Sequence, residues 1–329
     1  MRNSIIHSTS MFVPERVIKN EYFDELLGEN VSDWLEDNVK IYERRWCNEN
    51  QSTADLAFKA GKTALKNGNI VPQDIDLLII ATDTPEFISP STASKVQYML
   101  GLQNAATFDI NTACAGFVTA LVTASKFIIA DENYQTVMVI GVYAMSKYLN
   151  LTDKKTVNLF ADGAGCWILK SSNISNGGYL ASKLITKGEY FDYMGIYAGG
   201  TNKIINQQVL NDKANLLTIA KKFPTDLNPK IWVKIVHELS KKSKIKLKEV
   251  KLFLFTQINI NSIWETMDML NLPREKAQTS MHFFGYTGSA CIPIAFEDAL
   301  LQNKVKRGDI IFLIGSGGGL SFAGAAFRY

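Results

Sequence analysis

Histidine and cysteine are scarce in this chain of 329 residues, which contains three histidines and four cysteines. The cysteines, at Cys47, Cys114, Cys166 and Cys291, show no Cys-x-x-Cys spacing. So few cysteines in so long a chain argue against a disulfide scaffold, and we expect no metal site. A charge excess is also lacking, because 35 Lys and Arg face 32 Asp and Glu. With no recognised binding motif beside the basic residues, we expect no nucleic-acid partner.

Long uninterrupted hydrophobic runs are missing as well. The longest apolar stretches are broken by Lys126 or by turn residues, so no membrane span is predicted. No sustained apolar segment precedes Pro14, which argues against a secretion signal. Hydrophobic residues make up 47% of the chain and charged residues 20%, as in folded globular proteins. We therefore expect a cytoplasmic protein that makes no contact with a membrane.

The second half of the chain repeats the pattern of the first half. Residues 70–81, a polar segment that leads into an apolar strand, match residues 245–256, and further matches follow later in each half. Apolar strands that alternate with helices indicate an α/β protein with parallel or mixed sheets. We predict two copies of one α/β unit, at residues 1–172 and 173–329, with the functional site where the halves meet.

One stretch combines a β-type run, a polar bend and an almost uncharged helical segment, with Cys114 at the bend. A thiol at the first turn of a helix faces unpaired backbone N–H groups and the positive end of the helix dipole, which favour the nucleophilic thiolate. The small neighbours Ala113, Ala115 and Gly116 leave room for an acyl group on the sulfur. The alternative is a buried cysteine that only fills space.

The segment from Thr201 to Lys251 is unusually basic. It contains twelve Lys and four acidic residues, so the rest of the chain carries a net charge of −5. A local basic surface attracts an acidic partner, although a solvated helix face is the alternative explanation.

Four motifs follow one another along the chain. They are Ala113-Cys-Ala-Gly-Phe, Leu159-Phe-Ala-Asp-Gly-Ala-Gly, Gly285-Tyr-Thr-Gly-Ser-Ala-Cys-Ile-Pro and Gly317-Gly-Gly. In this order and spacing the chain resembles the thiolase-fold ketosynthases, most closely the 3-oxoacyl-(acyl-carrier-protein) synthase III group. The resemblance implies a thiolase-like fold of two pseudo-repeated halves, which form a five-layered αβαβα subunit in a homodimer.

The resemblance also implies a reaction. The cysteine of the family accepts an acyl group from a thioester, and a second thioester, usually malonyl, is decarboxylated and condensed with it. No permanently bound cofactor is implied, because acyl-ACP or acyl-CoA enters as substrate. The family's oxyanion hole uses the backbone N–H groups that correspond to Cys114 and Gly318 in this chain.

The decarboxylating half of the family's machinery is changed. Thr256-Gln-Ile-Asn stands where the family has His-Gln-Ala-Asn, so Thr256 replaces the His and Asn259 is kept. Tyr286 replaces the family's catalytic Asn. In the family these two side chains donate hydrogen bonds to the thioester carbonyl, so decarboxylative condensation should lose several kcal/mol of transition-state stabilisation.

The resemblance places a substrate-binding region as well. Trp34 matches the Trp that stacks on the adenine of coenzyme A, but Asn38 and Asn261 replace two phosphate-binding Arg and Lys154 replaces another. Lys and Arg are not equivalent at a bidentate phosphate site. Family members dock an acidic acyl carrier protein where this chain has Lys221, Lys222, Lys230 and Lys234. We therefore expect carrier-bound acyl groups rather than coenzyme A.

The preferred hypothesis is a ketosynthase-III-like acyltransferase of fatty-acid or related secondary-metabolite biosynthesis. It forms an acyl thioester on Cys114 and passes the acyl group to a nucleophile other than a malonyl-derived enolate, or to one generated by an unusual base. Glu86 and His282 are candidates for that base, although a surface ion pair and a structural role are their simpler interpretations.

Two other functions stay open. The chain could be a non-catalytic subunit that pairs with an active ketosynthase and shapes its acyl tunnel. Alternatively, Thr256 and Tyr286 support full condensation with altered geometry, which predicts release of carbon dioxide from a malonyl donor.

Overall fold

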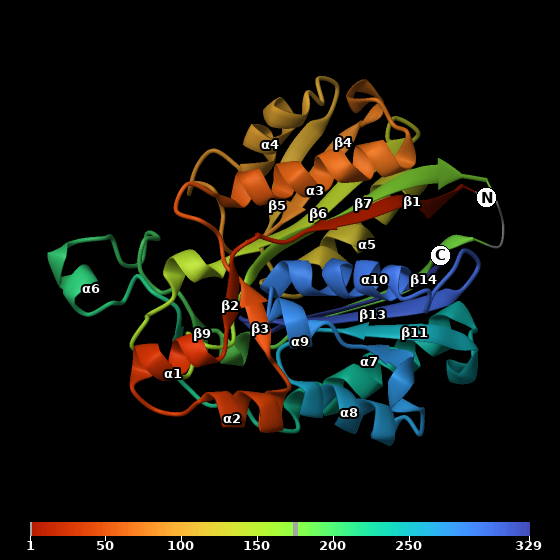
Figure 1. The fold of residues 1–329 in the computed structure, drawn as a ribbon. Coiled ribbons are helices and arrows are strands. Elements are labelled where there is room, and N and C mark those ends of the chain that lie inside the picture. Colours follow the sequence, from red (N-terminus) through yellow and green to blue (C-terminus); the bar gives the residue numbers. More distant parts are fainter. Residues whose placement is uncertain (1, 174–176) are drawn as a thin grey trace.

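The computed structural model describes residues 2–173 and 177–329, whose backbone builds two five-stranded sheets (Figure 1). In spatial order the first sheet contains β1 (Asn3–Phe12), β7 (Asp162–Ser172), β6 (Thr136–Ala144), β4 (Leu77–Ala81) and β5 (Ala106–Ile110). The second sheet contains β12 (Ala277–Gln278), β11 (Val250–Phe255), β13 (Ile310–Gly317), β14 (Ser321–Arg328) and β8 (Gly178–Thr186). All strands of the first sheet precede those of the second along the chain.

The two sheets share one topology. In the first, β4 runs parallel to β5 and β6, and β7 lies antiparallel beside β6. In the second, β11 runs parallel to β12 and β13, and β14 lies antiparallel beside β13. The matched segments 70–81 and 245–256 thus enter equivalent strands, as the internal repeat predicts. The division at residues 172 and 173 stays a prediction.

Helices cover both faces of each sheet, so that helices and sheets alternate in five layers (Figure 1). α5 (Gly116–Ala130) and α10 (Cys291–Leu301) lie between the sheets, since α5 contacts strands of both and α10 contacts β7 and β11. The outer face of the first sheet carries α3 (Thr53–Gly68) and α4 (Thr92–Leu100). The outer layer of the second sheet is formed by α7 (Leu227–Ser243) and α8 (Ile260–Met269). The predicted αβαβα fold is confirmed.

The central strands and α5 are almost entirely apolar because they are covered on all sides. Every residue of β4 and of β6 is buried. Of the helices in the described residues, the segment Ala113–Ala130 alone is long and apolar enough to cross a membrane, and 61% of it is buried between the sheets. This is the position of a core helix in a layered α/β fold.

Short elements complete the edge of the molecule where the candidate site lies. They are β2 (Val17–Lys19), α1 (Glu21–Leu27), α2 (Ser32–Trp34), β3 (Glu43–Arg45), β9 (Met194–Gly195), α6 (Gln207–Asn211), β10 (Thr218–Ile219) and α9 (Met281–Phe284). The sheets of both halves direct the carboxyl ends of their parallel strands to this region, where ligand sites of α/β proteins form.

Candidate active site

The turn before α5 holds Cys114 at the junction of the two halves. Strand β5 ends at Ile110, and α5 begins at Gly116. Between them Ala113 adopts a left-handed backbone conformation with φ of 44°, which residues other than glycine rarely occupy. This sharp turn places Cys114 at the entrance of the helix, where its side chain is 2% exposed.

The glycine-rich end of β13 packs directly against this turn. A Cβ atom on Gly317 would lie 2.5 Å from the backbone nitrogen of Cys114 and 2.5 Å from the carbonyl oxygen of Thr112. Only glycine therefore fits at this position. The next residue, Gly318, borders the space beside Cys114.

Tyr286 comes from the second half of the chain, and its hydroxyl faces the Cys114 thiol, whose pKa it lowers by hydrogen bonding to the thiolate. The backbone of Tyr286 is held by the LFADGAG segment, since its N–H donates to Leu159 at 2.9 Å and its carbonyl accepts from Ala161 at 2.9 Å. Its ring contacts the ring of Phe160 at a centroid distance of 5.3 Å. The residue is 1% exposed, so its position is fixed from both sides.

The thiol of Cys114 is neutral in the protein alone. Burial raises its pKa well above the ordinary value, the nearby Asp83 and Cys291 raise it further, and the hydrogen bond from Tyr286 lowers it. The positive end of α5 favours the thiolate, but burial opposes it, because a thiolate is costly to desolvate.

The Thr256 side chain is hydrogen-bonded to the backbone of β13. Its hydroxyl accepts a hydrogen bond from the Ser316 N–H at 2.8 Å and donates to the Ser316 carbonyl at 3.3 Å. Thr256 is 1% exposed and does not belong to the lining of either cavity described below. The Thr256 side chain thus fixes the end of β13, and its catalytic role stays a prediction.

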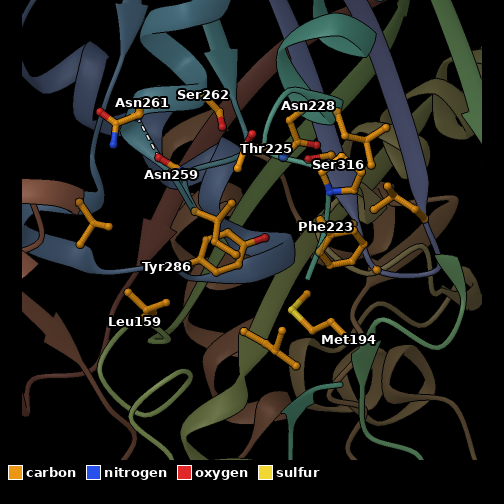
Figure 2. Close-up of a pocket in the computed structure, with 18 of the residues that line it drawn as sticks. Leu159, Met194, Phe223, Thr225, Asn228, Asn259, Asn261, Ser262, Tyr286 and Ser316 are labelled. Atoms are coloured by element: carbon orange, nitrogen blue, oxygen red, sulfur yellow. Dashed lines mark hydrogen bonds between the residues drawn. The ribbon is translucent and has the colours of Figure 1, made fainter. Parts of the chain in front are cut away.

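A large cavity of about 500 Å³ reaches Tyr286 from the surface (Figure 2). In Figure 2 Leu159 and Tyr286 lie on one side of it, and Phe223 and Met194 lie on the other. No charged side chain of the described residues lines it. Its lining comprises Trp34, Asn38, Val39, Leu159, Met194, Ile219, Phe223, Pro224, Thr225, Leu227, Asn228, Ile258, Asn259, Asn261, Ser262, Tyr286, Ser316, Gly317, Gly318 and Leu320.

A small cavity of about 250 Å³ lies on the other side of Cys114. Met194 and Gly318 border both cavities, and Cys114 lines the small one. Asp83 is the one charged residue in the described lining of the small cavity. The sequence pattern did not single it out, although a carboxylate just after an apolar parallel strand is a signal for a ligand site.

The outer end of the large cavity is built from neutral polar groups. Trp34 lies there and is 51% exposed. Asn261 donates a hydrogen bond from its side chain to the Asn38 carbonyl at 2.9 Å, and Asn259 caps α8 by accepting from the Asn261 N–H at 2.9 Å (Figure 2). The two residues that replace phosphate-binding arginines therefore join the walls of the cavity and offer no positive charge.

Three of the predicted binding lysines lie away from both cavities. Lys154 forms a surface ion pair with Glu29 at 3.1 Å and borders neither cavity, and its role as a phosphate-binding cation stays a prediction. Lys230 pairs with Asp226 one helical turn away on α7. Lys234 is exposed on the same helix.

Neither candidate base lies at the thiol. Glu86 accepts hydrogen bonds from Lys95 at 2.5 Å and from the Ala54 N–H at 2.9 Å, and it does not line either cavity. Both ring nitrogens of His282 are engaged, at 2.6 Å from the Lys40 carbonyl and 3.1 Å from the Thr279 hydroxyl. Glu86 and His282 therefore have the structural roles that their simpler interpretations gave them.

Known proteins match the chain along most of its length. The family model 3-Oxoacyl-[acyl-carrier-protein (ACP)] synthase III matches residues 108–188, and the model of the C-terminal part of that synthase matches residues 240–329. The beta-ketoacyl-[acyl-carrier-protein] synthase III of Syntrophomonas wolfei is 31% identical over 96% of this chain and 95% of its own. That of Clostridium perfringens is 32% identical over the whole of both chains.

A solved structure shows the same likeness in three dimensions. The 3-oxoacyl-[acyl-carrier-protein] synthase III of Aquifex aeolicus matches with a TM-score of 0.89 and 30% identity, over 99% of this chain and 100% of its own. The turn with Cys114, the packing of Gly317 against it and these matches together show that the chain belongs to the 3-oxoacyl-[acyl-carrier-protein] synthase III family.

Proposed function

We propose that this protein is an acyltransferase that forms an acyl thioester on Cys114 and passes the acyl group to a nucleophile other than a malonyl-derived enolate. The reaction belongs to fatty-acid or related secondary-metabolite biosynthesis. One observation carries the proposal: the Cys114 thiol lines the small cavity, which shares Met194 and Gly318 with the large cavity, while no histidine of the described residues lines either cavity.

Acylation of Cys114 needs no net gain or loss of protons. The thiol sulfur attacks the carbonyl carbon of the carrier-bound thioester, the bond from that carbon to the carrier sulfur breaks, and the proton of Cys114 ends on the departing carrier thiol. The backbone N–H groups of Cys114 and Gly318 are the proposed donors to the oxyanion. The Tyr286 hydroxyl stabilises developing negative charge on the Cys114 sulfur as the proton leaves.

Decarboxylative condensation is poorly supported by the same groups. It requires donors aimed at the carbonyl of the malonyl thioester, on which enolate charge develops. The Thr256 hydroxyl is already bonded to Ser316, and the Tyr286 hydroxyl is bonded to the Cys114 thiol. We infer that these two residues replace the family's His and Asn without taking over their function.

The uncharged large cavity favours a neutral pantetheine arm that is attached to a carrier protein. Coenzyme A would bring phosphate groups to the outer end of this cavity, where Asn38 and Asn261 bond to each other. Exposed lysines on and before α7, Lys222 and Lys234, offer a basic surface for an acidic acyl carrier protein. The proposed donor is therefore acyl-ACP rather than acyl-CoA.

We propose that the protein acts as a cytoplasmic homodimer. The loop between β4 and α4 exposes large apolar side chains, since Phe87 is 46% exposed and Ile88 is 87% exposed. Tyr98 on α4 is 84% exposed as well. Exposed large apolar side chains of this kind are typical of a protein interface.

The acceptor is tested after loading Cys114 from an acyl-ACP. The loaded protein is mixed separately with malonyl-ACP and with amine, alcohol and thiol acceptors, while loss of the acyl adduct and release of carbon dioxide are followed. The proposal predicts discharge to one acceptor class without carbon dioxide. Stoichiometric carbon dioxide with malonyl-ACP would instead establish full condensation and overturn the proposed acceptor.

A further inference from the structure

The small cavity is lined by a carboxylate that makes no hydrogen bond to another residue of the fold. Asp83 lies two residues beyond the end of β4 and borders the cavity together with Cys114. Its Oδ1 atom is shielded from solvent and has no hydrogen-bond partner. No other described residue donates a hydrogen bond to its side chain.

Two other carboxylates of this half accept hydrogen bonds from the backbone. Asp162 accepts hydrogen bonds from the Cys47 N–H at 2.6 Å and from the Ser146 N–H at 2.8 Å. Asp109 caps α4 by accepting from Thr92 at 2.6 Å and from Ala93 at 2.8 Å. A buried carboxylate without such partners costs stability and calls for an explanation outside the fold.

Glu297 provides a comparison, because its Oε1 atom is also buried and unpartnered. Its side chain borders neither cavity. Asp83 differs, since it borders the small cavity together with Cys114.

The remaining lining offers no countercharge. The other titratable groups that face the small cavity are Cys114, Tyr143 and Tyr197, and none of them is a cation. The Tyr197 hydroxyl donates to the Phe191 carbonyl at 3.4 Å. Burial raises the pKa of Asp83 to about 6, and a hydrogen bond from its own backbone N–H partly offsets this rise. The carboxyl is therefore mostly charged at neutral pH and has no donor from another residue.

We propose that Asp83 is a specificity residue that binds a hydrogen-bond donor, a hydroxyl or amino group, on the acyl chain attached to Cys114. The inference rests on the proposed function, because it requires an acyl thioester at Cys114. The large cavity admits the carrier arm, which leaves the small cavity to hold the acyl chain. The volume of the small cavity is about 250 Å³.

Competition between matched donors tests this assignment. The protein is exposed to an equimolar mixture of two carrier thioesters of equal chain length, one unsubstituted and one with a hydroxyl or amino group. Intact-protein mass spectrometry then gives the ratio of the two adducts. We expect wild type to favour the substituted acyl group about tenfold, as for a hydrogen bond to a charged group, and Asp83→Leu to lose this preference.

Two more variants sharpen the result. Asp83→Asn keeps an acceptor but removes the charge, so it should retain a preference for the hydroxylated chain and lose a preference for the amino chain. Glu86→Gln, in the same loop but outside both cavities, should behave as wild type.

The possible failures are distinguishable. An adduct ratio near one in wild type, or a preference that survives in Asp83→Leu, overturns the role of Asp83 and leaves acylation of Cys114 intact. The absence of any adduct with every donor overturns the proposed function and the inference with it.

Discussion

The hydroxyl of Tyr286 lies beside the thiol of Cys114 and lowers the pKa of that thiol, so the two halves of the chain meet at this pair of side chains. Cys114 precedes α5 of the first half, and Tyr286 follows α9 of the second. Burial raises the pKa of both groups well above their ordinary values. The pair is therefore neutral at rest, and the Tyr286 hydroxyl is the side-chain donor that stabilises Cys114 as it loses its proton.

Replacing Tyr286 with Phe should slow acylation of Cys114. Tyr286→Phe removes the hydrogen bond to the sulfur but keeps the ring that packs on Phe160. We expect acylation about tenfold slower, the value of one hydrogen bond of roughly 1.4 kcal/mol. The pKa of the thiol should rise further, which alkylation by iodoacetamide across a pH series would detect. Unchanged acylation and alkylation rates would show that the hydroxyl has no part in the chemistry.

Thr256 should affect stability more than chemistry. Thr256→Ala removes both hydrogen bonds to Ser316 at the end of β13 and should lower the free energy of unfolding by about 1–3 kcal/mol. Thr256→Ser keeps the hydroxyl and should restore most of the loss. Urea denaturation measures both variants. A Thr256→Ala variant of unchanged stability but abolished activity would instead make Thr256 a catalytic residue.

Asp83 should make the stability depend on pH. Its pKa is about 6 in the folded protein, against an ordinary value of 3.8, because the carboxyl is desolvated. As the pH rises from about 4 to 6, the unfolded chain releases this proton first, so the folded state loses up to about 3 kcal/mol. Asp83→Asn should therefore be more stable than wild type at pH 7.5, and by about half as much at pH 5.

Denaturation curves of both proteins at the two pH values check the sign of this effect. A difference that is equal at pH 5 and pH 7.5 would show that Asp83 titrates normally.

The basic surface near α7 should matter only for carrier-bound donors. Reversing the charge of Lys222 and Lys234 should slow acylation from acyl-ACP several-fold at low salt, and less at high salt, because the attraction is screened. Acylation from a small thioester that lacks the carrier protein should not change. Lys62→Glu, on α3 of the opposite outer layer, is the matched control. Equal slowing with both donors would argue against docking at this surface.

Much of the fold follows from the sequence. The internal repeat and the four motifs predict two equivalent α/β units, and the equivalent strands β4 and β11 confirm them. The motifs also lead to the turn with Cys114, to Gly318 and to Tyr286, all of which border the candidate site. These residues lie in the turns next to α5, β13 and α9, so their positions follow once the fold is known.

The remaining site residues depend on three-dimensional surroundings that no linear pattern shows. The family resemblance assigns Thr256 to a catalytic position. Its hydroxyl, however, is hydrogen-bonded to the backbone of Ser316. Lys154 meets Glu29, a residue distant in sequence. Desolvation raises the pKa of Cys114, which the position of this residue before a helix does not reveal. For the same reason Asp83, an ordinary loop residue by pattern, becomes an unpartnered carboxylate beside the nucleophile.

The most direct test of this account is intact-protein mass spectrometry of wild type and Cys114→Ala after exposure to a panel of acyl-ACP and acyl-CoA thioesters. We predict that wild type gains the mass of one acyl group, faster from acyl-ACP, and that Cys114→Ala gains none. No mass gain from any donor would contradict the account and would favour a non-catalytic subunit that pairs with an active ketosynthase.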